Sequence, residues 1–406
     1  MPFNVFKNTV LLFVFIMISY ACNSSTKASE IKQVQSTKTE PPIIVGANRT
    51  EIYLPMLQGK KIGIVANQTS VIFKTNGQFT HIVDSLLVSD VKLTKVFSPE
   101  HGFRGQADAG EVVKDGIDTK TNLPIVSLYG SNKKPSKEQL NDIDLLVFDI
   151  QDVGARFYTY ISTLHYVMEA CAENNIPVLV LDRPNPNGHY IDGPVLEPEH
   201  SSFVGMHPIP VVHGLTIGEY AQMINGEGWL KHKISCDLTV IPMEHYTHTS
   251  FYHLPIKPSP NLPNDQSINL YPSLCLFEGT NVNAGRGTDK QFQIYGSPHL
   301  PKSGFSYTPK PNAGAKHPKH EGKLCYGEDL SKIKPLSELN LSYLITAYST
   351  TSNKGDFFNS FFTKLAGTKQ LQQQIESGLT VNEIKASWEK DLSDFKQKRN
   401  KYLIYK

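Results

Sequence analysis

Acidic and basic side chains gather directly after an apolar run that ends at Phe97. The next residues, Ser98–Gly105 (SPEHGFRG), include Glu100, His101 and Arg104. A carboxyl group beside an imidazole and a guanidinium can perform general acid–base chemistry, because both neighbours affect its ionisation. We therefore expect Glu100 to be a general acid, with His101 tuning it or hydrogen-bonding a substrate. The alternative is that both side chains only order this loop.

Two further apolar runs end in the same way. One leads into Asp149–Tyr160 (DIQDVGARFYTY) and the other into Asp182–Pro186 (DRPNP). One polar ending is ordinary, because helix N-caps favour Ser, Asp and Asn. Several endings that carry Glu, His, Asp and Arg indicate a site. The candidates in these two segments are Asp149, Gln151, Asp152, Arg156, Tyr158, Tyr160, Asp182 and Arg183.

A fourth group lies further along the chain, in Glu278–Thr288 (EGTNVNAGRGT). A Glu beside an apolar run and before a Gly-rich loop is suited to face a cleft, although Glu278 could instead cap a turn or hold Arg286. Glycoside hydrolysis usually needs two carboxyl groups, one as acid and one as base or nucleophile. We favour Glu278 as the second group, ahead of Asp152 and Asp149. A substrate's own acetamido group is a further possible nucleophile.

The apolar runs predict the element that positions these residues. They alternate with helix-length segments, most clearly Phe157–Asn175. Continuous apolar strands separated by helices are typical of a parallel sheet covered on both faces, and ligands bind at the carboxyl ends of its strands. We predict a Rossmann-like α/β layer. Its predicted strands lie at residues 62–66, 91–97, 124–128, 145–148, 178–181 and, after a helix over 217–230, 238–241.

Four segments are expected along the chain. Residues 1–21 read as a lipoprotein-type signal peptide with Lys7 in a basic start and an apolar stretch over Val10–Ile18. Cys22 would be lipidated and so anchor an exported, periplasm-facing protein; an ordinary secretory peptide is the alternative. Residues 22–46 are a polar linker. The Rossmann-like catalytic domain spans 47–250, and an auxiliary α+β domain spans 251–406 and contributes to the cleft.

Composition and missing motifs exclude several classes of protein. The chain has 40 Lys and Arg against 38 Asp and Glu, so it has no strong positive field for nucleic acid. No GxGxxG follows the first strand, and GxxxxGK[ST], GxSxG and HExxH are missing. We therefore expect no cofactor and no metal. Four cysteines remain after Cys22; their spacing fixes no disulfide pairing, and Cys171 and Cys275 read as small buried side chains.

The motifs resemble those of bacterial exo-β-N-acetylmuramidases of the NamZ type. The resemblance covers the chain from about residue 47 and includes Pro258–Asn261 (PSPN) and the C-terminal Tyr402–Tyr405 as well as the segments above. One departure is Asn283-Ala284, where a Ser and a Val would be expected. The resemblance implies a Rossmann-like domain and an auxiliary domain, with the active site in the cleft between them.

The resemblance also implies the reaction. The family releases N-acetylmuramic acid from the non-reducing end of peptidoglycan fragments by cutting its β-1,4 bond to N-acetylglucosamine, as in cell wall recycling. The lactyl carboxylate of muramic acid suits a bidentate Arg, for which we favour Arg156, then Arg286, then Arg104. Asn281 suits the acetamido group. The competing interpretations are a lipid-anchored muropeptide-binding protein and a hydrolase of the peptide part of the wall.

Overall fold

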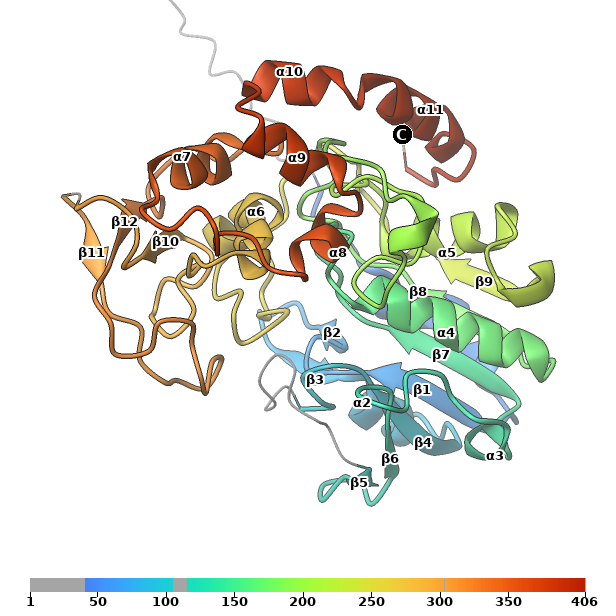
Figure 1. Ribbon diagram of the computed structural model, residues 1–406. Helices are drawn as coiled ribbons and strands as arrows, with labels where there is room; N and C mark the ends of the chain where they lie inside the picture. Colours follow the sequence, from blue (N-terminus) through green and yellow to red (C-terminus); the bar gives the residue numbers. More distant parts are fainter. Residues whose placement is uncertain (1–40, 105–114, 303, 406) are drawn as a thin grey trace, which may run out of the picture. The chain divides into compact units, whose positions relative to one another are not determined.

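The computed structural model describes residues 41–104, 115–302 and 304–405, and Figure 1 shows their arrangement. The predicted signal peptide and Cys22 lie outside these residues, as does most of the predicted linker. Within the described ranges, no helix is long and apolar enough to cross a membrane. By contacts between residues, Pro41–Lys406 form one compact unit, so the domain boundary near residue 250 stays a prediction.

Seven strands form the main sheet, in the order β5-β6-β4-β1-β7-β8-β9. Their bounds are β1 Ile62–Ala66, β4 Leu93–Ser98, β5 Gly116–Ile117, β6 Pro124–Ser127, β7 Leu145–Asp149, β8 Val178–Leu181 and β9 Leu238–Ile241. All neighbouring strands are parallel except β5 and β6. Numbered along the chain, the parallel strands have the order 3-2-1-4-5-6 of a Rossmann sheet. The predicted α/β layer is confirmed.

Helices and a small hairpin surround the sheet. They are η1 Gly46–Asn48, α1 Thr50–Leu57, β2 Val71–Phe73, β3 Phe79–His81, α2 Ile82–Val88, α3 Lys137–Leu140, α4 Tyr160–Glu173, η2 Pro198–His200, α5 Ile217–Gly226 and η3 Lys231–Lys233. Val65 and Phe148 point into a core that α4 and α5 complete, whereas Ile64 and Val147 point into a second core with α1 and α2. Burial on both faces explains why these strands are continuously apolar.

The second half of the chain combines helices with a small antiparallel sheet, as predicted. Its elements are α6 Asp265–Leu274, η4 Cys275–Gly279, β10 Ile294–Ser297, β11 Ser306–Tyr307, β12 Cys325–Asp329, α7 Ser342–Thr350, α8 Phe362–Ala366, α9 Gln370–Glu376, α10 Val381–Ala386 and α11 Glu389–Arg399. The sheet has the order β10-β12-β11. In Figure 1 it lies at the left, and α7, α9, α10 and α11 run across the top in orange to dark red.

Prolines at positions 255, 258, 260, 263 and 272 of the sequence favour loops in this part of the chain, yet helix α6 forms there. Asn264 begins it with a capping box that includes Ser267. Pro272 lies inside the helix and has no N–H to offer the carbonyl of Ile268. The side-chain amide of Asn187 donates to that carbonyl instead, at 3.0 Å. A partner 81 residues away in sequence therefore makes this helix possible.

Residues 357–365 and 383–390 each have a helical pattern in the sequence, and the helices of the structure differ in extent from both. The expected helix over 357–365 begins only at Phe362, because the segment before it pairs with the end of η4: Thr280 forms a bridge with Phe358, and the N–H of Asn359 donates to Gly279. The expected helix over 383–390 is two helices, α10 and α11, which meet at Ser387 and Trp388.

The last residues of the chain reach back to the main sheet. The hydroxyl of Tyr405 donates to Asp182, just after β8, at 2.7 Å, and accepts from the N–H of Met243 at 2.8 Å. The backbone N–H of Ile404 donates to the Glu219 carboxylate at 2.9 Å. The C-terminus is therefore part of the Rossmann half of the fold.

Candidate active site

A cavity of about 290 Å³ lies beyond the carboxyl end of the sheet. Its lining from the first half of the chain is Glu100, His101, Tyr129, Phe157, Tyr158, Thr159, Tyr160, Phe203 and Val204. Its lining from the second half is Ser259, Asn261, Leu262, Tyr271, Cys275, Glu278, Arg286, Phe292, Phe361 and Leu365. Two carboxyl groups, one guanidinium and many aromatic rings thus share one cavity. A concave, largely aromatic lining with a few polar groups is typical of a ligand-binding site.

Glu100 projects from a tight turn immediately after β4. His101 and Gly102 both have left-handed backbone angles (φ 71° and 78°), and the Gly102 N–H donates to the carbonyl of Pro99 at 3.1 Å. This turn interrupts the chain at the end of the strand and leaves Glu100 in the cavity wall. The hydroxyl of Thr159, which precedes α4, donates to Glu100 Oε2 at 2.7 Å.

Tyr129 also contacts Glu100. Burial raises the pKa of the Tyr129 hydroxyl well above its usual value, and the charge of Glu100 and a hydrogen bond with it add to the effect. Glu100 is therefore held by hydroxyl groups from two segments, one after β6 and one at the start of α4. His101 is buried beside it and lines the same cavity.

Glu278 faces the cavity from the second half of the chain, on η4. The Nη1 atom of Arg286 lies 3.5 Å from the Glu278 carboxylate, and its Nη2 atom donates to the carbonyl of Gly314 at 3.2 Å. Burial is the main cause of the raised pKa of Tyr271; after the Cys275 thiol, the charges of Glu100 and Glu278 raise it further. The charges of both carboxylates therefore raise the pKa of the same hydroxyl group, as expected if both carboxylates face the cavity.

A partly buried lysine holds the backbone around Glu278. The amino group of Lys319 donates to the carbonyls of Phe277 and Val282, at 2.9 and 3.0 Å, and also to that of Thr280. Burial lowers the pKa of Lys319, and the negative charge of Glu278 opposes this shift. Lys319 is therefore a positioning residue for the segment that carries Glu278.

Tyr158 and Tyr160 line the cavity with their rings, 4.8 Å apart and edge to face. Their hydroxyls both donate to the carbonyl of Pro258, at 2.8 and 3.3 Å, and Tyr160 also accepts from Asn67 at 2.9 Å. Burial, followed by the charge of Glu100, raises the pKa of Tyr160. These hydroxyls tie the two halves of the chain together, so the rings rather than the hydroxyls are available to a ligand.

Arg156 does not line the cavity. Its guanidinium is fully buried and donates to four backbone carbonyls, those of Pro194, Ile209, Leu365 and Ala366, at 2.7 to 2.8 Å. Burial lowers its pKa to about 9, so it stays charged at neutral pH. The structure therefore places this predicted carboxylate ligand in a structural position.

Three more predicted site residues form buried contacts outside the cavity lining. Asp149 and Arg183 make a bidentate pair at 2.6 and 2.9 Å, with both side chains buried. Asp182 accepts from Tyr405 and from Thr216, each at 2.7 Å. Burial raises the pKa of Asp182 to about 7. These groups connect strand ends to neighbouring segments.

Asp152 and Gln151 lie behind the cavity wall. One carboxylate oxygen of Asp152 accepts from the Gly154 N–H at 2.7 Å, while among the described residues the other has no hydrogen-bond partner. Burial raises the pKa of Asp152 to about 7. The Gln151 amide donates to the carbonyls of Asp152 and Pro184.

The remaining predicted residues also lie outside the cavity lining. Arg104 pairs with Asp118 at 2.8 Å and packs on the Phe103 ring. The Asn281 amide donates to the carbonyl of Asn353 at 3.5 Å. Of the predicted site residues, only Glu100, His101, Tyr158, Tyr160, Glu278 and Arg286 line the cavity.

The sequence prediction did not include several cavity residues. Thr159 lies between two predicted tyrosines, and Asn261 ends the PSPN segment, so motif membership could have indicated both. Tyr129 lies two residues after β6, and its position at a strand end is the only signal it carries. Phe203 and Phe361 lie in segments without a recognisable pattern.

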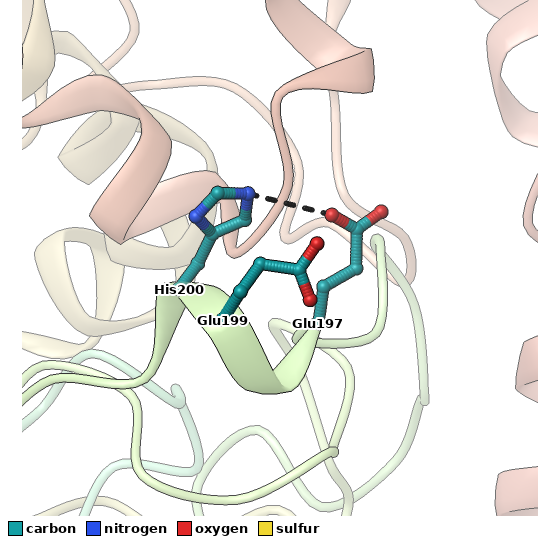
Figure 2. Close-up of side chains that lie close together, drawn as sticks. All are labelled: Glu197, Glu199 and His200. Carbon is teal, nitrogen blue, oxygen red and sulfur yellow. Dashed lines mark ion pairs between the residues drawn. The ribbon is translucent and has the colours of Figure 1, made fainter.

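One group of possible metal ligands occurs in the described residues, and Figure 2 shows it. Glu197, Glu199 and His200 lie around η2, outside the cavity lining, with His200 Nε2 3.4 Å from a Glu197 oxygen. The other Glu197 oxygen accepts from Thr368 at 2.7 Å. Both contacts therefore involve Glu197, which pairs with His200 on one side and with Thr368 on the other. Cys171, Cys236, Cys275 and Cys325 are buried and unpaired.

Comparison with known proteins identifies the family. The family model described as "Exo-beta-N-acetylmuramidase NamZ, N-terminal" matches residues 62–266. The model described as "Exo-beta-N-acetylmuramidase NamZ, C-terminal" matches residues 269–405. The chain belongs to the NamZ family. It is 41% identical to peptidoglycan beta-N-acetylmuramidase NamZ of Bacillus subtilis (strain 168) over an alignment of 429 positions. The alignment covers 98% of this chain and 100% of that protein.

Two solved structures share the fold. Both are DUF1343 family proteins from Bacteroides fragilis NCTC 9343. One is 46% identical with a TM-score of 0.83, covering 90% of this chain and 99% of that one. The other is 29% identical with a TM-score of 0.74, covering 90% and 100%. The resemblance found in the sequence motifs is confirmed.

Proposed function

We propose that the cavity between Glu100 and Glu278 is the active site of an exo-β-N-acetylmuramidase. The chain is a glycosidase of the NamZ family that acts on peptidoglycan. The observation that carries the assignment of the site is the presence of two carboxyl groups, from opposite halves of the chain, in the lining of one cavity. Glycoside hydrolysis usually requires such a pair.

The contacts of the two carboxyl groups suggest different roles. Arg286 lies beside Glu278, with a guanidinium nitrogen 3.5 Å from its carboxylate, and it is the one arginine or lysine among the described residues that line the cavity. Glu278 then acts as the base or nucleophile, or polarises the acetamido group of a substrate that attacks its own anomeric carbon. Glu100 is held by the hydroxyls of Thr159 and Tyr129 and donates its proton to the leaving oxygen.

The bond cleaved is the β-1,4 link from a non-reducing terminal N-acetylmuramic acid to N-acetylglucosamine. The lactyl carboxylate of that sugar needs a cation, and among Arg104, Arg156 and Arg286 only Arg286 lines the cavity. We therefore assign the lactyl group to Arg286.

The site of action follows from the N-terminal sequence. The apolar stretch over Val10–Ile18 followed by Ala21-Cys22 supports export and lipidation of Cys22. The enzyme would then be tethered to a membrane by its lipid and face the periplasm, where it would meet peptidoglycan fragments. The polar residues 23–46 would provide the reach of the tether.

The test uses the tag-free mature protein and two substrates: the disaccharide of N-acetylmuramic acid β-1,4-linked to N-acetylglucosamine, and a chromogenic β-muramide. Mass spectrometry should detect free N-acetylmuramic acid. Glu100→Gln should lower turnover by about 10²–10⁴-fold because it removes a general acid. Retention of more than about a tenth of the activity would exclude Glu100 from that role. Saturable binding without any release would instead identify a muropeptide-binding protein.

A further inference from the structure

The side chain of Asn261 lines the cavity and carries an unused hydrogen-bond acceptor. The residue is 3% exposed, and its amide nitrogen donates to the carbonyl of Gly314 at 2.6 Å. Its amide oxygen has no hydrogen-bond partner among the described residues. The contact with Gly314 fixes which atom is which, since exchanging them would place two carbonyl oxygens against each other.

Gly314 holds Asn261 and Arg286 side by side. Its carbonyl accepts from Asn261 and, at 3.2 Å, from Arg286. A Cβ atom added at Gly314 would lie 2.8 Å from the Asn261 amide oxygen, so only glycine leaves room for the amide in this position. The Gly314 N–H is in turn held by Asn312 at 3.1 Å.

A buried acceptor without a partner destabilises the empty site, and a ligand that supplies a donor removes this cost. N-acetylmuramic acid has a single N–H, on the acetamido group at C2. The lactyl ether occupies the neighbouring carbon, C3, so that position has no hydroxyl donor. With Arg286 on the carboxylate at C3, Asn261 meets a donor on a neighbouring carbon: the N–H at C2 or, on the other side, the hydroxyl at C4. The amide N–H is the donor that distinguishes this sugar from one without an acetamido group.

We propose that Asn261 is a specificity-determining residue that accepts the acetamido N–H of the muramyl sugar. This inference rests on the proposed function and refines it. It also replaces Asn281, predicted for this role from sequence, which lies outside the cavity lining. A site built to pair with a substrate N–H discriminates strongly against an analogue without it, because the acceptor is then buried unpaired.

The test compares two competitive inhibitors of nearly equal shape: N-acetylmuramic acid, and its analogue with a 2-O-acetyl ester, in which oxygen replaces the N–H. The wild type should bind the amide about 10- to 100-fold more tightly than the ester. Asn261→Ala should reduce that ratio to within about threefold, mainly through weaker binding of the amide. A purely structural role would weaken both inhibitors equally and leave the ratio unchanged.

Gly314→Ala provides a second variant that keeps the Asn261 side chain but displaces its amide, and the same loss of preference is expected. Circular dichroism establishes that each variant is folded. A wild type that binds amide and ester equally would overturn the inference, as would an Asn261→Ala protein that keeps the preference while Asn281→Ala loses it. Cleavage of the disaccharide by the wild type is scored separately, so failure of the proposed function is distinguishable from failure of the Asn261 assignment.

Discussion

Arg156 is expected to stabilise the fold rather than to bind substrate, and Arg156→Met tests this. The buried guanidinium joins two pairs of carbonyls, one at Pro194 and Ile209 and the other at Leu365 and Ala366. Methionine fills similar space but has no donor, so four buried carbonyls each lose a hydrogen bond, and that of Ile209 keeps the one from the Leu196 N–H.

The structure sets the size of the effect. A net contribution of about 1 kcal/mol for each hydrogen bond gives a loss of about 4 kcal/mol in the free energy of unfolding. A larger loss per bond is not expected, since burying the cation already costs part of what its bonds contribute. With an unfolding entropy of about 2.1 cal/mol/K per residue, the midpoint of thermal unfolding should fall by on the order of 5 °C.

Urea and thermal unfolding measure the stability, with Arg104→Met as the matched control. Arg104 is a partly exposed arginine in an ion pair with Asp118, so Arg104→Met should lower the free energy of unfolding by less than about 1 kcal/mol. Because Leu365 lines the cavity, Arg156→Met should lower turnover of muramyl and glucosaminyl substrates alike. An unchanged melting temperature together with a loss confined to muramyl substrates would refute the reasoning.

Three other outcomes follow from the site and its surroundings. Lys319→Met should lower the free energy of unfolding by about 2–4 kcal/mol, because backbone carbonyls lose a charged donor. Since the segment that carries Glu278 is then no longer held in place, kcat should fall by a larger factor than KM rises. Asp152, with a pKa raised to about 7 in the folded protein, contributes stability that is complete below about pH 4 and is lost as the pH rises to 7. Urea titrations at pH 4.5 and 8 should therefore show that wild type loses on the order of 2–4 kcal/mol more than Asp152→Asn over this range, and equal pH dependence would contradict the assignment. Arg286→Ala should weaken muramyl inhibitors at least tenfold more than glucosaminyl ones, in competition assays, because the guanidinium pairs with a carboxylate.

The sheet could be predicted from sequence because its signal is local. Strands such as β1 and β7 are buried on both faces, so their residues are apolar as far as Asp149 at the end of β7, and the alternation with helices then indicates a parallel sheet. The carboxyl edge follows from that topology. Glu100 and Glu278 could be proposed because each directly adjoins an apolar segment.

The direction of each side chain depends on contacts that the sequence does not display. Arg156 points away from the cavity because its backbone pairs with Val211, and residue 155 forms a bridge with Val212. Helix α6 tolerates its internal proline because the Asn187 amide donates to the carbonyl that the proline leaves without a partner. Tyr129 reaches Glu100 because β6 and β4 are neighbours, which strand lengths alone do not reveal.

The link between Tyr405 and Asp182 has a consequence for how the chain is made. The two residues are 223 positions apart in the sequence. Until residue 405 has been synthesised, the buried carboxyl group after β8 lacks one of its donors, and closing so long a loop is slow. The end of β8 is therefore expected to complete its hydrogen bonds late, well after the strand itself has been made.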